Sequence, residues 1–167
     1  TLDIVNLRLG NANGPQDAPF ADSLEALVRL QQRGLIRHIG LSNVTHKQFT
    51  EAKAIADIVC VQNQYNLVSR SDDAFIDALA DEGVAYVPFF PLGGFTPLQS
   101  SLLNEIAEEA SATPKQIALA WLLQRSPNIL VIAGTSSVAH LRENLAAAHL
   151  SLSADQVRRL NEMTENK

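Results

Sequence analysis

The sequence has very little sulfur, since its 167 residues include one cysteine and one methionine. A single cysteine cannot form an intramolecular disulfide, which excludes the small disulfide-stabilised class of secreted proteins. Cys60 lies within the apolar stretch DIVCV, where a thiol is expected to be buried and unreactive. We therefore expect a protein of the reducing cytoplasm.

Long apolar runs and an excess of positive charge are also absent. No stretch approaches the roughly 20 apolar residues of a membrane-spanning helix, and the start, TLDIVNLRLG, lacks the basic segment and cleavage site of a signal peptide. The sequence contains 13 Lys and Arg residues and 18 Asp and Glu residues, which gives a net charge of -5. This balance argues against a broad nucleic-acid footprint. We expect a soluble domain with neither a membrane nor a nucleic-acid partner.

What the sequence does contain is an alternation of two hydrophobic periods. Short, weakly alternating apolar runs are typical of strands buried on both faces, and apolar residues three or four apart predict helices. The strand-like runs cover residues 3–9, 36–41, 58–64, 84–90 and 128–133. The helical patterns include Leu24, Leu27 and Val28; Phe49, Ala52 and Ala56; Ile76, Leu79 and Ala80; and Ile117, Trp121 and Leu122. The alternation predicts five parallel strands joined by helices.

Capping signals mark where several of these helices begin and end. A hydroxyl residue stands three positions before a glutamine at three places, as a capping box requires. The pairs are Thr45 and Gln48, Thr113 and Gln116, and Ser153 and Gln156. Pro114 occupies a first helical position, which tolerates proline, and Gly34 and Gly83 stand where helices are expected to end.

Polar and small residues follow successive strands. They are Ser42 and Asn43, Asn63 and Gln64, Gly93 and Gly94, and Thr135 to Ser137. A barrel of parallel strands builds its site at this end, whereas a doubly wound sheet usually uses a glycine-rich G-x-G-x-x-G turn, which this sequence lacks. A complete barrel usually needs about 250 residues. We therefore predict that residues 1–167 form a single α/β domain, a partial (β/α)8 TIM barrel of about five parallel strands with outer helices.

Four segments in order resemble one family. They are IRHIGLSNV (36–44), VQNQYN (61–66), VPFFPLGG (87–94) and VIAGTSSVAHLRENL (131–145), followed by the closing LSADQVRRLN (152–161). Together they resemble the cofactor half of the aldo-keto reductases, which are NAD(P)H-dependent carbonyl reductases on a (β/α)8 barrel. The resemblance covers essentially the whole chain and aligns it with the fourth to eighth strands of the family. It implies an oxidoreductase that reduces aldehydes or ketones to alcohols, with NADPH preferred over NADH.

The resemblance also implies where the adenosine end of the cofactor binds. The residues concerned are Gly134, Thr135, Ser136, Ser137, His140, Arg142 and Asn144. A hydroxyl-rich turn at a helix start offers free N–H groups and a positive dipole end, which suit the 2′-phosphate. Many family members have Lys or Arg where Gly134 and Ser136 stand, so His140 and Arg142 are the nearby basic groups here. Alternatively, Ser136 or Ser137 only caps the helix.

The nicotinamide and pyrophosphate ends are implied in the same way. The residues are Ser42, Asn43, Gln64, Phe89, Pro91, Leu92, Gly93 and Gly94. Ser42, Asn43 and Gln64 match the residues that hold the carboxamide, and Phe89 matches the aromatic residue that stacks on the ring. The segment PLGG at 91–94 resembles the pyrophosphate loop. Taken singly, Asn43 also fits a turn, Phe89 a core position and the glycines a plain loop.

The proton-transfer residues of the family have no counterpart in this chain. The family uses a Tyr assisted by a Lys and an Asp, and in the alignment all three precede Thr1. The fourth-strand His of the family falls at Arg8, which can donate to a carbonyl oxygen but cannot act as a base. His38, His46 and His149 lie outside the matched positions, and no two of them have a metal-ligand spacing, so we predict no metal site.

Two functions remain open at this point. The first is a carbonyl reductase, seen here as a fragment that lacks the catalytic Tyr, Lys and Asp and is inactive alone. The second is a nucleotide-binding regulatory protein on the same fold, without essential turnover. An unrelated phosphate-binding barrel is a third reading. The expected partners are a small aldehyde or ketone and, because a partial barrel leaves sheet edges unpaired, another copy of the chain.

Overall fold

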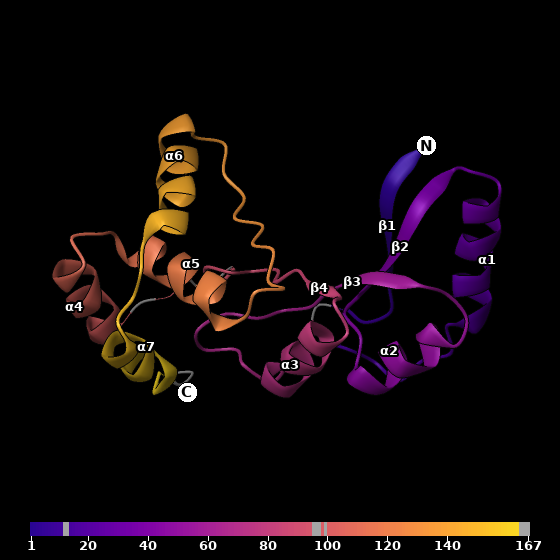
Figure 1. Ribbon diagram of the computed structural model, residues 1–167, viewed down its shortest axis with the longest axis horizontal. Helices are drawn as coiled ribbons and strands as arrows, with labels where there is room; N and C mark the ends of the chain where they lie inside the picture. The colour runs from indigo at the N-terminus through magenta and orange to yellow at the C-terminus, as the bar shows by residue number, and fades with distance from the viewer. Residues whose placement is uncertain (12–13, 95–97, 99, 164–167) are drawn as a thin grey trace. The chain divides into compact units, whose positions relative to one another are not determined.

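The computed structural model describes residues 1–11, 14–94, 98 and 100–163 (Figure 1). The chain divides into two compact units. The first contains residues Thr1–Asn63 and Phe75–Val87, and the second contains Gln64–Ala74 and the residues from Pro88 onward. No helix in the described ranges is both long and apolar enough to cross a bilayer.

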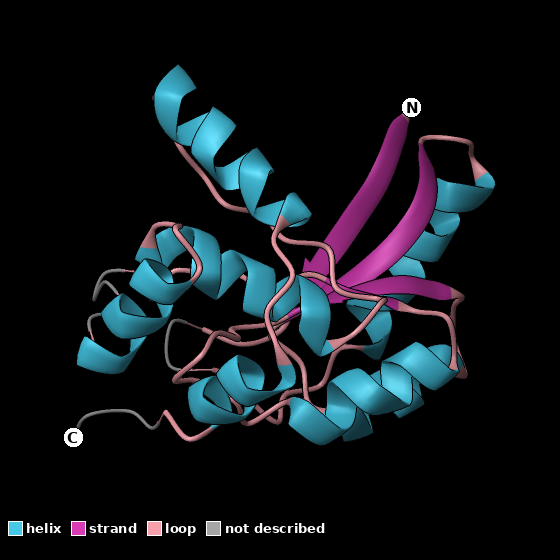
Figure 2. Cartoon of the chain, turned by 60° about the vertical axis from the view of Figure 1, so that its left-hand side comes forward, coloured by secondary structure: helices cyan, strands magenta, loops and turns pink. Residues whose placement is uncertain are grey.

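The first unit is a parallel sheet covered by helices. Its strands are β1 (Leu2–Arg8), β2 (Ile36–Ser42), β3 (Ile58–Gln62) and β4 (Ala85–Tyr86), paired in the order β1-β2-β3-β4 and drawn in magenta in Figure 2. The helices are α1 (Ala21–Gln32), α2 (His46–Lys53) and α3 (Asp73–Asp81), of which α3 belongs to this unit from Phe75 onward. One-way pairing throughout the sheet agrees with the predicted parallel architecture.

Alternation along the strands gives this sheet two different faces. One face carries Ile39, Leu41 and Val61, all fully buried, and α1 packs against β2. The opposite face is polar near its centre. A Cβ at Gly40 would lie 2.1 Å from Asn6 Oδ1 and 2.5 Å from Cys60 Sγ, so these side chains lie on the same face as Gly40. Cys60 is buried, as predicted, and burial raises the pKa of its thiol.

The second unit is helical. It contains α4 (Ser101–Glu109), α5 (Pro114–Arg125), α6 (Val138–Ala146), the short 3₁₀ helix η1 (Ala147–His149) and α7 (Ala154–Asn161). Helix α5 is buried nearly all round, through Ile117 to Leu122, and contacts α4, α6 and η1. The core of this unit therefore lies around α5.

Local signals in the sequence are confirmed. Capping boxes are present at all three predicted places, beginning at Thr45, Thr113 and Ser153, and Pro114 occupies the start of α5. Gly34 and Gly83 have φ of 72° and 69° after α1 and α3, a left-handed conformation that glycine adopts without steric cost.

The predicted fifth strand, at 128–133, is wrong. Ile129 makes a single bridge, and the described residues 130–137 form no strand. Leu130 and Ile132 are 61% and 42% exposed. The apolar pattern expresses a preference for burial, but a strand also needs a neighbouring backbone to pair its N–H and C=O groups. Two other strands are shorter than predicted, since β3 ends at Gln62 and β4 has two residues.

Candidate functional site

Asn43 follows β2 directly at the carboxyl end of the sheet and is held in an uncommon backbone conformation. Its φ is 60°, and its side chain is 1% exposed. Its Nδ2 donates to the carbonyl oxygens of Asn11, at 2.5 Å, and Gly14, at 3.1 Å. Its Oδ1 is buried and has no hydrogen-bond partner among the described residues. An unpaired buried acceptor is costly, so this oxygen is suited to a ligand that brings a donor.

Neighbouring residues hold Asn43 in this conformation. Asn63 Oδ1 accepts from the Val44 N–H at 3.0 Å, and Asn63 Nδ2 donates to the Val44 carbonyl at 2.7 Å. The Asn43 N–H donates to the Gln62 carbonyl at 2.9 Å. Asn63 was expected at the end of its strand, but its clamp on Val44 was not predicted, because the partner is set by strand pairing and not by sequence spacing.

Gly10 is a second positioning residue that the sequence did not reveal. A Cβ there would lie 2.2 Å from the Gly14 carbonyl oxygen and 2.4 Å from Asn43 Nδ2. Carbon never approaches oxygen or nitrogen so closely without a bond, so only glycine fits. A glycine two residues after the end of β1 was the one available signal.

Arg8 is the last residue of β1 and pairs in register with Ser42, the last residue of β2. Its Nη1 donates to Ser42 Oγ at 3.3 Å, and Ser42 is buried. At the position where the family has a histidine, Arg8 therefore places a guanidinium at the carboxyl end of the sheet. It lies beside Ser42, one of the residues predicted to hold the carboxamide of the cofactor. Arg8 carries donors only, which fits an oxygen of a substrate and excludes a role as a base.

In the second unit, Gln64 and Phe89 are paired. They form a parallel bridge, and the Tyr65 N–H donates to the Phe89 carbonyl at 3.4 Å. Both side chains are half-buried. The rings of Phe89 and Phe90 meet edge to face with centroids 5.3 Å apart. Gln64, which is predicted to hold the carboxamide, and Phe89, which is predicted to stack on the nicotinamide ring, thus lie on adjacent backbone segments.

The segment at 91–94 is a tight turn. Gly93 and Gly94 have φ of 92° and 63°, and the Gly93 N–H donates to the Phe90 carbonyl at 3.0 Å. A Cβ at Gly94 would lie 2.6 Å from Phe90 Cγ. Pro91 is buried and Leu92 half-buried. The small residues are therefore required by the turn itself, and their predicted contact with pyrophosphate stays a prediction.

The predicted adenosine residues gather at the start of α6. Gly134, Thr135 and Ser136 precede the helix and are exposed, and His140 and Arg142 are exposed on its first turns, with Asn144 half-buried further along. Ser137 caps the helix, since its Oγ accepts from the His140 N–H at 3.4 Å, and the Ser137 N–H donates to Thr135 Oγ1 at 3.1 Å. The capping role considered for Ser137 is therefore present.

A charged cluster follows Gln64 in the second unit. The Tyr65 hydroxyl donates to Asp73 Oδ1 at 2.5 Å, and the Arg70 and Arg125 guanidiniums pair with the same carboxylate. Burial acts to raise the pKa of Asp73, but the hydrogen bonds from Tyr65 and Arg70 and the charges of Arg70 and Arg125 hold that pKa below its usual value. Burial and the Asp73 carboxylate raise the pKa of Tyr65, so this phenol stays protonated.

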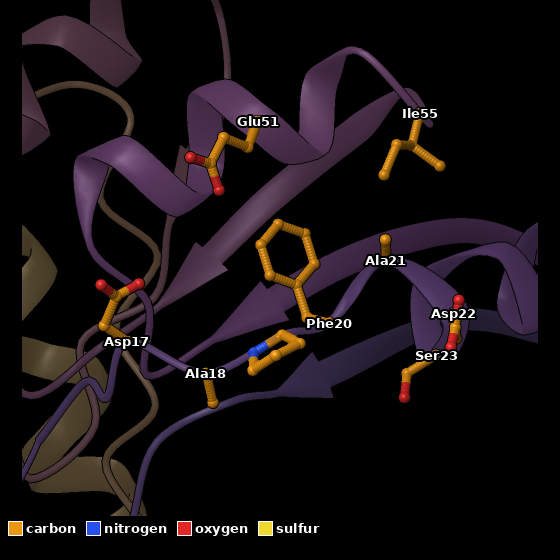
Figure 3. A pocket seen from close by; sticks show the side chains of 9 residues that line it. Asp17, Ala18, Phe20, Ala21, Asp22, Ser23, Glu51 and Ile55 are labelled. Carbon is orange, nitrogen blue, oxygen red and sulfur yellow. The ribbon is translucent and has the colours of Figure 1, made fainter.

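Two hollows lie apart from most of the predicted residues. The first, in the first unit, has a volume of about 650 Å³ and places Phe20 among the carboxylates of Asp17, Asp22 and Glu51 (Figure 3). Its acidic lining does not suit a phosphate. The second, in the second unit, has a volume of about 520 Å³ and a mostly apolar lining, to which Gly134 and the polar Asn144 also contribute. In the described part of the chain, no three His, Cys, Asp or Glu side chains are grouped to hold a metal ion.

Known proteins resemble the chain along most of its length. Residues 12–165 match the Aldo/keto reductase family. The chain is 64% identical over 156 residues to pyridoxine 4-dehydrogenase of Escherichia coli (strain K12), an alignment that covers 92% of this chain and 54% of that protein. It is 38% identical over 145 residues to an uncharacterized oxidoreductase of Schizosaccharomyces pombe, covering 86% of this chain and 47% of that protein. The chain spans about half the length of these curated relatives.

Solved structures give the same result for the fold. A thermostable aldo-keto reductase crystallised with the inhibitor epalrestat has a TM-score of 0.83 and 33% identity, covering 95% of this chain and 58% of that one. The apo form of Gox0644, at 23% identity, shares the fold with a TM-score of 0.80. The predicted partial barrel is confirmed as a fold class, with the strand count corrected as above.

Proposed function

Because this chain belongs to the aldo-keto reductase family, we propose that the full-length protein is an NADPH-dependent oxidoreductase that interconverts a small alcohol and its aldehyde or ketone. The chain would supply the half that holds the cofactor. One observation carries this proposal above all: the buried Oδ1 of Asn43, at the carboxyl end of β2, lacks a donor among the described residues.

The residues of the nicotinamide end fit a carboxamide. A carboxamide presents an NH₂ donor and a carbonyl acceptor, and Asn43 Oδ1 needs such a donor. In the first unit, the Ser42 hydroxyl adds a group that donates or accepts. The family resemblance assigns the Gln64 amide and the aromatic face of Phe89, both in the second unit, to the same end of the cofactor. When bound, NADPH supplies the hydride. These side chains would fix which face of the ring is presented, since hydride transfer demands close alignment of the reacting carbons.

The start of α6 fits the adenosine end and favours NADPH over NADH. Thr135, Ser136 and Ser137 bring hydroxyl groups to a positive helix terminus, and Arg142 adds a cation on the same helix. Gly134, His140 and Asn144 complete the proposed surface, and Pro91, Leu92, Gly93 and Gly94 are proposed for the pyrophosphate. The cap that Ser137 makes uses its oxygen as an acceptor and leaves its O–H as a donor.

Catalysis needs a proton donor that we place upstream of Thr1, as the family resemblance implies. Arg8 would orient a substrate oxygen beside Ser42 without exchanging a proton. General acid assistance typically contributes about 10² to 10⁴ in rate. This chain alone should therefore bind the cofactor and show no enzymatic turnover.

The relative at 64% identity narrows the proposed substrate class. Its name describes dehydrogenation of pyridoxine at carbon 4, which converts a hydroxymethyl group on a pyridine ring into an aldehyde. We take a pyridine-based alcohol and aldehyde pair of this kind as the proposed substrates. The protein is further proposed to work in the cytoplasm, where its free thiol stays reduced.

NADPH absorbance with pyridoxal tests the proposal, with the full-length protein and this chain assayed side by side. We expect turnover by the full-length protein alone. Comparable turnover by this chain would refute the placement of the proton donor. NADPH binding by both without turnover on any aldehyde would favour the regulatory function instead.

The exposed edge of the sheet supports a proposed contact with other chain segments. Leu2 and Ile4, on the edge strand β1, are 62% and 52% exposed. An apolar unpaired edge favours pairing with another strand. We expect this chain alone to self-associate, and light scattering that shows a stable monomer would contradict this.

A further inference from the structure

The segment that carries Gln64 is anchored by six residues of the second unit, which we call the Asp73 cluster. They are Tyr65, Arg70, Asp73, Trp121, Arg125 and Asn161. The Tyr65 side chain is 0% exposed and its ring stacks on Trp121, with centroids 5.8 Å apart. Because its hydroxyl also donates to Asp73, both the ring and the oxygen of Tyr65 are fixed.

Asp73 is the centre of this cluster. Its carboxylate accepts from Tyr65, from Arg70 Nε at 3.3 Å and from Arg70 Nη2 at 2.9 Å. Arg125 Nη2 donates to the backbone carbonyl oxygen of Asp73 at 2.9 Å. Further contacts extend to α7, where Arg70 Nη1 donates to the Asn161 carbonyl at 2.7 Å and Trp121 Nε1 donates to Asn161 Oδ1 at 2.8 Å. Asp73 thus ties the segment after Gln64 to α5 through Arg125, and Arg70, which pairs with Asp73, links the same segment to α7.

Anchoring Tyr65 constrains its neighbours on both sides. Successive side chains of an extended segment alternate, so a Tyr65 fixed in the core directs Gln64 to the opposite side. The Tyr65 N–H donates to the Phe89 carbonyl, and Asn66 Nδ2 donates to the Phe90 carbonyl at 3.0 Å. The backbone at Phe89 and Phe90 is therefore held by the anchored residue itself and by its neighbour Asn66.

We infer that Asp73 is a positioning residue for the nicotinamide end of the cofactor, acting through Tyr65 on Gln64 and Phe89. The inference rests on the proposed function, because it takes Gln64 and Phe89 as the residues that hold the ring. Asp73 itself touches no part of the cofactor in this arrangement.

Two ligands that differ only in the nicotinamide separate positioning from general stability. NADPH and 2′-phospho-ADP-ribose, which is NADPH without its nicotinamide, are titrated by calorimetry into the full-length protein. The dissociation constant of 2′-phospho-ADP-ribose divided by that of NADPH measures what the nicotinamide contributes to binding. Asp73→Asn should reduce this ratio about tenfold while leaving the affinity for 2′-phospho-ADP-ribose unchanged. A variant that merely lost stability would weaken both ligands together.

Two further variants complete the experiment. Glu109→Gln removes a carboxylate that pairs with Arg159 at 2.7 Å in the same unit and is not part of the Asp73 cluster, so it should leave the ratio unchanged. Tyr65→Phe keeps the ring and removes the hydroxyl, so it should reduce the ratio in the same direction and serves if Asp73→Asn does not fold. The emission of Trp121, the one tryptophan of the chain, monitors the cluster in each variant.

The outcomes distinguish this inference from the proposed function. If the wild-type protein binds neither ligand, both fail. If it binds NADPH more tightly than 2′-phospho-ADP-ribose and the folded variants keep the wild-type ratio, the proposed function stands and the role of Asp73 is refuted. A wild-type ratio near unity also refutes it, since Gln64 and Phe89 would then contribute nothing to binding.

Discussion

Removing one oxygen from Tyr65 should destabilise the protein measurably. In Tyr65→Phe the ring keeps its volume and its stacking on Trp121, so no cavity forms, and the substitution removes the contacts of the hydroxyl, including its hydrogen bond to Asp73. A hydrogen bond to a charged group contributes about 1.5–3 kcal/mol. Asp73 keeps its contacts with Arg70 and Arg125, so its carboxylate is not left unpaired. We therefore expect a loss near the lower end, about 1.5 kcal/mol in the free energy of unfolding.

Urea unfolding of the full-length protein at pH 7, followed by Trp121 emission, measures this loss. The midpoint should fall without a change in slope, because the same surface is exposed on unfolding. Glu109→Gln is the matched control, since exposed ion pairs contribute little to stability and its midpoint should not move. If Tyr65→Phe unfolds at the wild-type urea concentration, the hydroxyl makes no net contribution and the cluster owes its stability to ring packing alone.

Three further predictions concern pH, the phosphate and the carboxamide. The pKa of Asp73 is lower in the folded state than its ordinary value of 3.8, so the carboxylate contributes fully to stability above pH 3.8 and loses this contribution as the pH falls through the folded pKa. Unfolding curves of Asp73→Asn and wild type should therefore converge only below pH 3.8, and convergence at pH 5 would contradict this. Arg142→Ala should weaken NADPH about tenfold and leave NADH unchanged, because the lost contact is a charge-assisted hydrogen bond; equal losses for both cofactors would show that Arg142 does not contact the 2′-phosphate. Gly10→Ala forces a methyl group against Asn43, which should cost about 1–3 kcal/mol of stability. It should also lower the contribution of the nicotinamide to binding, measured by calorimetry with NADPH and 2′-phospho-ADP-ribose; an unchanged contribution would mean that the position of Asn43 is not critical.

Short-range patterns in the sequence were sufficient for much of the fold. The capping boxes at Thr45, Thr113 and Ser153 are set by a hydroxyl and an amide three residues apart, and both partners are readable without a structure. Parallel strands followed from apolar runs that alternate with helical patterns. The family resemblance added the positions of Ser42, Asn43, Gln64 and Phe89, of which the structure pairs Gln64 with Phe89.

Strand pairing and long-range contacts were decided only by the tertiary structure. The run at 128–133 has the composition of a strand, but pairing depends on a neighbour that composition does not specify. Asp73 gave no signal in the sequence, because its partners include Arg125 on α5, whose side chain reaches it only after the chain has folded. The unpaired oxygen of Asn43 is likewise a property of packing: the sequence determined which amide stands after β2, and the fold determined that one of its atoms is buried without a protein donor among the described residues.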